Sequence, residues 1–262
     1  MLKQIFRLIN FSVFLIKNNG FNFNSLKAII IWQVLHISKK IGIANKIRDE
    51  WKMLPLSLKI GNLKLIGRTG HIGLIEEVFF QRKINYDEKR DIVDCGSNIG
   101  FFALYINQKY KTNRVFCIEP DPANLVLLKS NVKQNKVNKI KIIESAIGNK
   151  KSICSFISTE NGVGSYLGKS AVKKNEVLIK VKIDTLDNIV KENKITPGFI
   201  KIDVEGNEVP ALLGAKMTLE TFHPTLLIEI HKKGGYPIIE KYLKKFQYVS
   251  FEKMFGDTII CK

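Results

Sequence analysis

One stretch of the chain combines residue types and spacing that suit the binding of a ligand. "DIVDCGSNIGFF" (residues 91–102) passes from an apolar strand pattern into a turn with two glycines and then into a helical pattern. Glycines at the end of a strand let backbone amides approach a ligand closely. The nicotinamide fingerprint G-x-G-x-x-G does not fit, because Asn98 stands where its second glycine belongs. The turn therefore predicts a ligand other than a dinucleotide.

The residues of this turn indicate the charges that the ligand carries. Gly96 permits a tight bend, and Gly100 lets the helix approach its neighbours. The amides at the helix start, with Ser97 and Asn98, suit a carboxylate, while Asp94 suits a cation. A carboxylate, an ammonium and a sulfonium together describe S-adenosylmethionine. The alternative is that the two glycines only shape a strand–helix corner.

The next two strand patterns supply residues for the rest of such a ligand. "NRVFCIEP" places Glu119 at a strand end, where a carboxylate can accept hydrogen bonds from both ribose hydroxyls. In "IKIIESAIG" the short residues Ser145 and Ala146 would flank the adenine ring. Alternatively, Glu119 caps the helix that begins near Pro122.

Candidates for the chemical step follow two later strand patterns. "IKIDVEGNE" brings Asp203, Glu205 and Glu208 close together, so that repulsion would raise a pKa or favour a bound cation. If such a ligand donates its methyl group to an acceptor that carries a proton, a side chain must take that proton, and Glu205 is the first choice. Asp203 is expected to contact the donor's methionine end or the acceptor. Glu208 has an alternative role at a helix N-terminus.

"IEIH" places Glu229 and His231 on the same face of a strand. His231 is a second candidate base, because a free imidazole titrates near pH 6.5, although a histidine at a strand end is often structural. Together with Asp203 and Glu205 these side chains could instead bind a divalent cation. No spaced ligand motif supports a metal, and we predict none.

The patterns around these motifs indicate an α/β fold. From Asp91 onward, short apolar runs alternate with helical patterns, as in a doubly wound sheet whose parallel strands are covered on both faces. The last apolar runs, "QYVSFEK" and "DTIICK", predict a C-terminal antiparallel hairpin. We expect a helical extension over residues 1–55, a hairpin and helix over 56–90, and a main domain over 91–262. A Gly/Ser/Lys-rich segment, 151–187, reads as a β-insertion that covers the substrate side.

The composition indicates which partners and which cellular compartment suit the protein. The 42 Lys and Arg residues exceed the 24 Asp and Glu residues, which gives a net charge of +18 and favours anionic partners, although the lysines are scattered. The four cysteines form no C-x-x-C pair, which suits a reducing, cytoplasmic setting. Two apolar runs within residues 1–55 are shorter than the ~20 residues of a spanning helix. They predict either helices packed on the main domain or peripheral contact with a membrane.

Several of these motifs together resemble the FkbM family of methyltransferases. The resemblance covers roughly residues 91–231 and rests on "DCGSNIGFF", "VFCIEPDPANLVLLKSNV", "VKIDTLDNI", "FIKIDVEGNEVPALLGA" and "PTLLIEIH". It implies a Rossmann-like class I methyltransferase fold with S-adenosylmethionine as donor. Many members methylate hydroxyl groups of sugars or of polyketide-type natural products.

The sequence therefore predicts an S-adenosylmethionine-dependent methyltransferase that acts on a hydroxyl of a sugar, a glycan or a natural product. The first alternative is an RNA or DNA methyltransferase, suggested by the net charge. The acidic "DVEG" segment would repel phosphates and counts against it. The second alternative is a non-catalytic membrane-surface protein that keeps the donor pocket. Nothing in the sequence predicts the oligomeric state.

Overall fold

The computed structural model describes residues 13, 30, 52–74, 87–110, 114–159, 165–168, 176–254 and 256–262. Most of the predicted N-terminal helical extension, and most of the helix predicted from Ile72 onward, therefore lie outside the described residues. Within the described ranges, no helix has the length and apolar character needed to cross a membrane.

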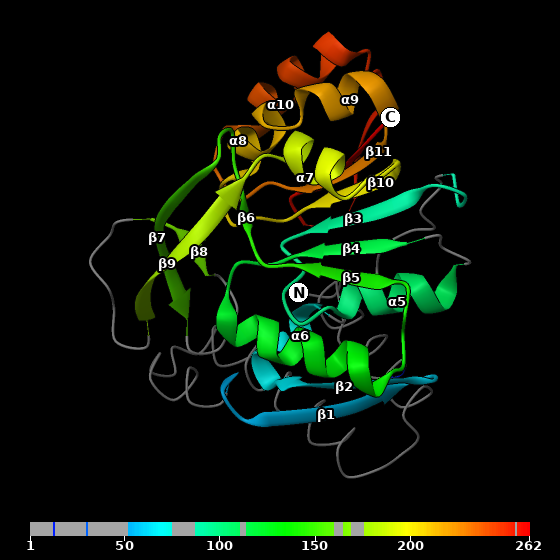
Figure 1. The fold of residues 1–262 in the computed structure, drawn as a ribbon, viewed down its shortest axis with the longest axis vertical. Helices are drawn as coiled ribbons and strands as arrows, with labels where there is room; N and C mark the ends of the chain where they lie inside the picture. The colour runs from blue at the N-terminus through cyan, green and yellow to red at the C-terminus, as the bar shows by residue number, and fades with distance from the viewer. Residues whose placement is uncertain are drawn as a thin grey trace.

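A seven-stranded sheet forms the centre of the molecule (Figure 1). Its spatial order is β12 (Phe251–Lys253), β13 (Thr258–Cys261), β11 (Thr225–Glu229), β10 (Pro197–Ile202), β3 (Asp91–Cys95), β4 (Val115–Ile118), β5 (Ile140–Ile143). The five strands from β11 to β5 are parallel. β13 pairs antiparallel with β11, and β12 pairs antiparallel with β13 at the edge of the sheet. The predicted doubly wound sheet and its C-terminal hairpin are confirmed.

Helices cover both faces of this sheet (Figure 1). One face carries α5 (Phe101–Lys109) and α6 (Pro122–Gln134), and the other carries α7 (Leu186–Glu192), α8 (Glu208–Leu213), α9 (Lys216–Phe222), α10 (Gly235–Leu243). Two short 3-10 turns are formed by Thr69–His71 and Lys244–Phe246, and residues 72–74, after the first of them, are helical. Every residue of β3 and β4 is buried, because both faces of these strands lie under helices.

A hairpin packs outside the α5–α6 layer. Its strands, β1 (Pro55–Ile60) and β2 (Leu63–Arg68), pair antiparallel around Gly61, where the sequence predicts a turn. Asn131 of α6, fully buried, accepts a hydrogen bond from the Ile66 amide at 2.8 Å and donates one to the Ile66 carbonyl at 2.9 Å. One side chain therefore pairs both backbone groups of a β2 residue and fixes the hairpin on the helix.

The segment predicted to be a β-insertion, 151–187, forms a second sheet together with a short strand that precedes it. Its strands are β6 (Ala146–Ile147), β7 (Ser152–Thr159), β8 (Tyr166–Leu167) and β9 (Glu176–Asp184), in the order β6-β9-β7-β8. This sheet stands beyond the carboxyl ends of β3, β4 and β5 (Figure 1). The hydroxyls of Ser158 and Ser165 both donate to the buried carboxylate of Asp121, which caps α6. Hydrogen bonds thus anchor the insertion to the main domain.

One helix prediction is wrong in its extent. "NEVPALLGAKMTLE" reads as one helix, but the structure ends α8 at Leu213 and begins α9 at Lys216. Gly214 lies between them against the backbone of Gly148, so closely that a Cβ would overlap the Gly148 carbonyl. The amide of Asp187 also donates to the Gly214 carbonyl at 2.9 Å. Tertiary contacts at the glycine therefore outweigh the local helical pattern.

The strand order reverses between β3 and β10. From β3 the chain continues to β4 and β5 on one side, and β10 and β11 extend the sheet on the other. At this switch point Gly96 has φ +80° and packs against the backbone of Asp203, where a Cβ would overlap the carbonyl. The Asp203 amide donates to the Cys95 carbonyl at 3.0 Å. Only glycine permits both the left-handed backbone and this close approach.

This contact predicts that a methyl group added at Gly96 destabilises the protein more than a methyl group added at a glycine with open space around it. We expect Gly96→Ala to lower the free energy of unfolding by about 3 kcal/mol, from left-handed strain plus steric overlap. Gly256→Ala is the matched control, because Gly256 has φ +64° with no atom within 4 Å of the added Cβ; we expect about 1 kcal/mol there. Urea denaturation measures both, and equal losses would contradict the steric argument.

Candidate active site

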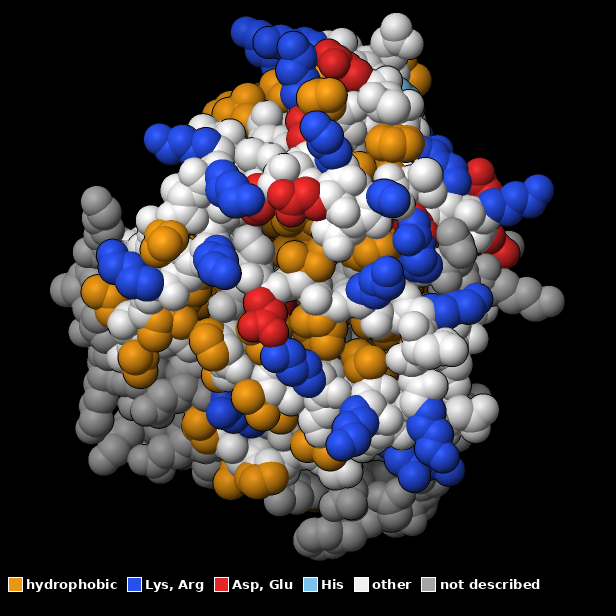
Figure 2. All heavy atoms as spheres, viewed as in Figure 1, with side chains coloured by type: hydrophobic (Ala, Val, Ile, Leu, Met, Phe, Trp, Pro, Cys, Tyr) orange, Lys and Arg blue, Asp and Glu red, His pale blue; other side chains and the backbone are white. Residues whose placement is uncertain are grey.

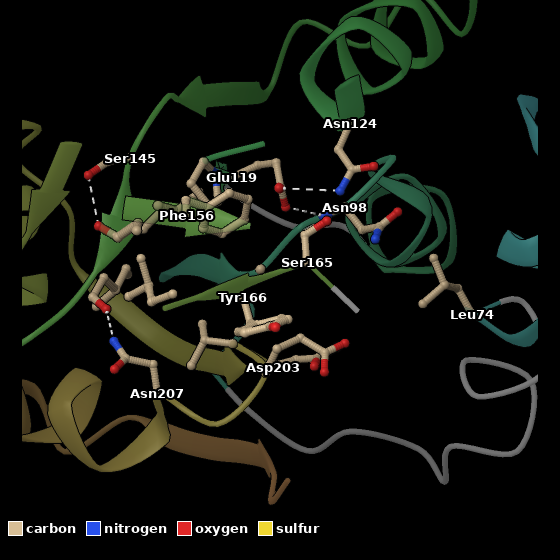
Figure 3. A pocket seen from close by; sticks show the side chains of 18 residues that line it. Leu74, Asn98, Glu119, Asn124, Ser145, Phe156, Ser165, Tyr166, Asp203 and Asn207 are labelled. Atoms are coloured by element: carbon tan, nitrogen blue, oxygen red, sulfur yellow. Dashed lines mark hydrogen bonds between the residues drawn. The ribbon is translucent and has the colours of Figure 1, made fainter. Parts of the chain in front are cut away.

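A cavity lies at the switch point, between the main sheet and the inserted sheet. Its empty space, counted to the open mouth and with the solvent there included, is about 690 Å³. The carboxyl ends of the parallel strands and the loops after them form one wall, and the inserted sheet forms the other (Figure 3). The lining residues are Leu74, Gly96, Asn98, Ile118, Glu119, Pro120, Asn124, Ser145, Ala146, Ile147, Phe156, Ser165, Tyr166, Leu167, Asp203, Val204, Glu205, Asn207.

Glu119 is held rigidly at the end of β4. One carboxylate oxygen accepts from the Asn98 amide at 2.8 Å, and the other accepts from the Asp121 amide at 3.0 Å and from the Asn124 side chain at 3.4 Å (Figure 3). Only 4% of the residue is exposed. Burial raises the pKa of Glu119 to about 7, although the hydrogen bonds oppose that shift. Asp121, and not Glu119, is the N-cap of α6, and Glu119 accepts from the amide of that cap residue. Its carboxylate oxygens can also accept a hydrogen bond from a ligand.

The turn after β3 divides its predicted residues into two groups. Gly96 and Asn98 line the cavity, and Asn98 has a left-handed φ of +50°. Ser97 and Gly100 shape the turn instead. The Ser97 hydroxyl donates to the Asp94 carbonyl at 2.7 Å, and Gly100, at φ +80°, packs against Leu128. Both residues were predicted to contact the ligand. In the structure they shape the loop, and neither lines the cavity.

Asp94 is fully buried at the end of β3, outside the cavity lining. Neither of its carboxylate oxygens accepts a hydrogen bond from any described residue, and the nearest cation is the Lys201 ammonium at 3.9 Å. Burial raises the pKa of Asp94 to about 6, against the opposing charge of Lys201. A buried carboxylate with so little compensation leaves negative potential beside the switch point.

The residues predicted to lie beside adenine also line the cavity. Ser145 and Ala146 connect β5 to the inserted sheet, and the Ser145 hydroxyl donates to the Ala146 carbonyl at 2.8 Å. Phe156 and Tyr166 of the inserted sheet complete this part of the lining. The cavity thus has aromatic and short side chains on its walls, as a planar ring requires.

Carboxylates gather at the end of β10. Asp203 pairs with the Lys201 ammonium at 2.7 Å, and the following Glu205 and Gly206 both have left-handed backbones, at φ +49° and +93°. This loop turns the Glu205 side chain toward His231, whose Nε2 lies 3.4 Å from a Glu205 oxygen. Burial and neighbouring carboxylates raise the pKa of Glu205 despite the opposing charge of His231.

His231 lies at the centre of four carboxylates. Its Nδ1 donates to Glu208 at 2.8 Å, and its Nε2 faces Asp203 at 3.7 Å, Glu205 at 3.4 Å and Glu229 at 3.8 Å. Burial alone would lower the pKa of His231, but the Glu208 hydrogen bond and the carboxylate charges raise it to about 9. His231 is therefore protonated at neutral pH, contrary to the ordinary titration assumed from the sequence.

Glu208 positions this group. One of its oxygens accepts from both the Gly206 amide at 2.7 Å and His231, and 2% of the residue is exposed. Glu208 begins α8, as the sequence suggests, and its hydrogen bonds also connect the Glu205 loop to His231 in the segment after β11.

Glu229, at the end of β11, also has a raised pKa. Burial and the charge of Asp203 raise the pKa of Glu229 to about 7.

A cation remains an alternative occupant of this cluster. Asp203, Glu205 and His231 each offer one ligand atom within 4.8 Å of the others. The raised pKa of His231 favours a proton over a metal ion on its nitrogen at neutral pH. The described residues thus suit a cationic ligand group at least as well as a metal ion.

The structure brings together residues that the sequence identifies and others that it does not. Asp203 and Glu205 share the cavity with Gly96, Asn98, Glu119, Ser145 and Ala146. Lys201, which balances Asp94 and Asp203, reads in the sequence as an ordinary strand lysine. Phe156 and Tyr166 were missed as well, because only the composition of their segment marked it as a cover for the site.

Comparisons with known proteins agree with this geometry. Residues 94–250, more than half of the chain, match the model of the methyltransferase FkbM domain. Methyltransferase 1 of Beauveria bassiana (strain ARSEF 2860) is 24% identical over 47% of this chain and 57% of its own length. Methyltransferase sdnD of Sordaria araneosa is 24% identical over 59% of this chain and 78% of its own length.

Among solved structures, the methyltransferase FkbM from Methylobacillus flagellatus KT resembles this fold with a TM-score of 0.52 and 21% identity. The match covers 71% of this chain and 49% of that one, so this chain spans about half the length of that relative. The likeness shows the fold, and the match over residues 94–250 shows the family. This chain belongs to the FkbM methyltransferase family.

Proposed function

We propose that this chain transfers a methyl group from S-adenosylmethionine to a hydroxyl oxygen of a sugar, a glycan or a natural-product acceptor. The observation that carries the proposal is a single cavity with Glu119 on one strand end and the carboxylates Asp203 and Glu205 on another. Membership of the FkbM methyltransferase family supports the reaction class. The acceptor class rests on the family resemblance of the sequence motifs.

The residues present fit S-adenosylmethionine. Glu119 has carboxylate lone pairs for the ribose hydroxyls, and Ser145 and Ala146 leave room for adenine. Asp203 and the buried, under-compensated Asp94 supply negative potential for the ammonium and sulfonium. Gly96 has no side chain to occupy the edge of the cavity, where a Cβ would overlap the Asp203 carbonyl. When bound, this donor supplies a methyl group whose bond to sulfur breaks as its bond to the acceptor oxygen forms.

The carboxylates of the cluster are the proton acceptors in this proposal. His231 already carries its proton at neutral pH, and Lys201 holds Asp203 at 2.7 Å. Glu205 lines the cavity, its side chain is 36% exposed, and its pKa is raised toward the range in which a base works best. We assign the acceptor's hydroxyl proton to Glu205. Protonated His231 orients Glu205 and stabilises its charge.

The two alternatives from the sequence have less support. Figure 2 shows Lys and Arg side chains spread over one face of the molecule rather than gathered in one patch, unlike a nucleic-acid groove. Carboxylates also surround the site itself. The non-catalytic membrane-surface alternative depends on residues 1–55, most of which lie outside the described part of the chain. Peripheral membrane contact through them stays a prediction.

Isothermal titration calorimetry tests the donor site. We expect saturable binding of S-adenosylmethionine to the wild type and a Kd about 10- to 100-fold higher for Glu119→Ala, since two charge-assisted hydrogen bonds are lost. Glu220→Ala, an exposed carboxylate on α9, is the control and should bind as the wild type does. No heat with the wild type would end the donor assignment.

If Glu205 is the base, replacing it should lower the rate of methyl transfer but leave the binding of the donor unchanged. Glu205→Gln keeps the size of the side chain but cannot take a proton, so methyl transfer should fall about 100-fold or more while donor binding changes little. Mass spectrometry of glycans and small metabolites from cells with the wild type, with the variant and with neither protein measures transfer. Undiminished methylation by the variant would exclude Glu205 as the base.

The protonation of His231 is directly measurable. The chain has four histidines, so an NMR titration of imidazole signals can follow each one. We expect a pKa near 9 for His231 in the wild type and a clear downward shift in Glu208→Gln, which replaces the hydrogen-bonded carboxylate with a neutral amide. His71, whose pKa burial lowers to about 4, is the control and should titrate alike in both proteins. A wild-type value near 6.5 would instead restore His231 as a neutral base.

A further inference from the structure

A second cavity begins at His231. It lies between the segment that follows β11 and the β12–β13 hairpin, and the amide of Ile230 donates to the Asp257 carbonyl across its base at 3.1 Å. Its empty space, counted to the open mouth, is about 930 Å³. Because Glu205 lines the first cavity and lies 3.4 Å from His231, a single side-chain contact joins the two cavities.

The lining of this second cavity is strongly basic. Lys232, Lys233 and Lys253 all line it, and Asp257 is the one carboxylate among its described lining residues. None of the three lysines forms an ion pair with a described carboxylate. With three lysines against one carboxylate, the described lining of the cavity carries net positive charge, next to a cluster of negative charge. Such a basic lining suits an anionic ligand.

Lys232 connects this basic cavity to the proposed chemistry. A Cβ placed on Gly206 would lie 3.3 Å from Cε of Lys232, so the lysine stem crosses the loop that carries Glu205. Gly234, with φ +75°, is the N-cap of α10 and lines the cavity, which adds the positive end of a nine-residue helix. The positive groups thus come from two segments that the fold brings together, the consecutive residues 232–234 before α10 and Lys253 of β12.

The remaining walls are flat and apolar. Tyr236 and Phe251 line the cavity together with Ile230 and Ile259. Aromatic side chains beside polar groups suit the apolar face of a sugar ring, while cations suit a charged substituent. A neutral acceptor would use the aromatic walls and leave the lysines unpaired. An acceptor with both a ring and an anionic group uses the whole lining.

We propose that this lysine-lined cavity is the acceptor subsite, and that the acceptor is a sugar bearing a phosphate or diphosphate. The inference rests on the proposed methyl transfer, since it places the acceptor's hydroxyl at Glu205 and His231 and its phosphate among Lys232, Lys233 and Lys253. It refines the acceptor class from any hydroxyl compound to a phosphorylated sugar. The same chemistry occurs in nucleotide-linked and in polyprenyl-linked sugars.

Calorimetry with inorganic pyrophosphate, at about 150 mM salt to screen non-specific attraction, tests the subsite. We expect saturable binding to the wild type and binding at least tenfold weaker for the double variant Lys232→Gln, Lys233→Gln. The control, Lys133→Gln with Lys150→Gln, removes the same charge from exposed lysines outside the cavity. Absent binding to the wild type, or equal weakening in both variants, overturns the proposal.

Two further titrations separate this proposal from the methyltransferase proposal and identify the source of the phosphate. S-adenosylmethionine should bind the lysine double variant as it binds the wild type; its failure to bind the wild type would reject the donor site, whatever pyrophosphate does. Uridine diphosphate glucose in solution and a polyprenyl diphosphate hexose in detergent micelles are then compared. Tighter binding of either one than of pyrophosphate supports the subsite and indicates the source. Binding of both no tighter than glucose alone overturns the phosphorylated-sugar assignment.

Discussion

The close contact between Gly96 and the backbone of Asp203 is the constraint on which the site depends. It joins the loops after β3 and β10 at the point where the strand order reverses, and the Asp203 amide bonds to the Cys95 carbonyl beside it. Because Gly96 has no side chain, the two loops lie close enough together to form one wall of the cavity. Glu119 is then fixed by the amide of Asn98 from the same turn.

The charges around this contact follow from the same arrangement. Asp94 and Asp203 come from adjacent parallel strands and share one ammonium, that of Lys201. The carboxylates of Glu205 and Glu229 add to a local excess of negative charge that His231 and Lys201 offset in part. Such an excess raises the pKa of its members and favours a cationic ligand. The carboxylates beside the first cavity therefore favour a cationic ligand group, while the lysines of the second cavity favour an anionic one.

Much of this architecture could be predicted from the sequence, for identifiable reasons. Strands buried on both faces appear as continuous apolar runs, and the turn after β3 has glycines at positions that need left-handed backbone. Other features depend on contacts between distant segments. The break at Gly214 comes from packing against Gly148, and the elevated pKa of His231 comes from its hydrogen bond to Glu208 and from the charges of Glu205, Asp203 and Glu229. No local pattern signals the contact between the two glycines or the hydrogen bond between Glu208 and His231.

A crystal structure with S-adenosylhomocysteine, the product of the donor, tests the central claim most directly. The account predicts the nucleoside in the cavity between the main and inserted sheets, with both ribose hydroxyls donating to Glu119 and the amino acid end beside Asp203. Density for the nucleoside in any other place, or Glu119 directed away from the ribose, would contradict it.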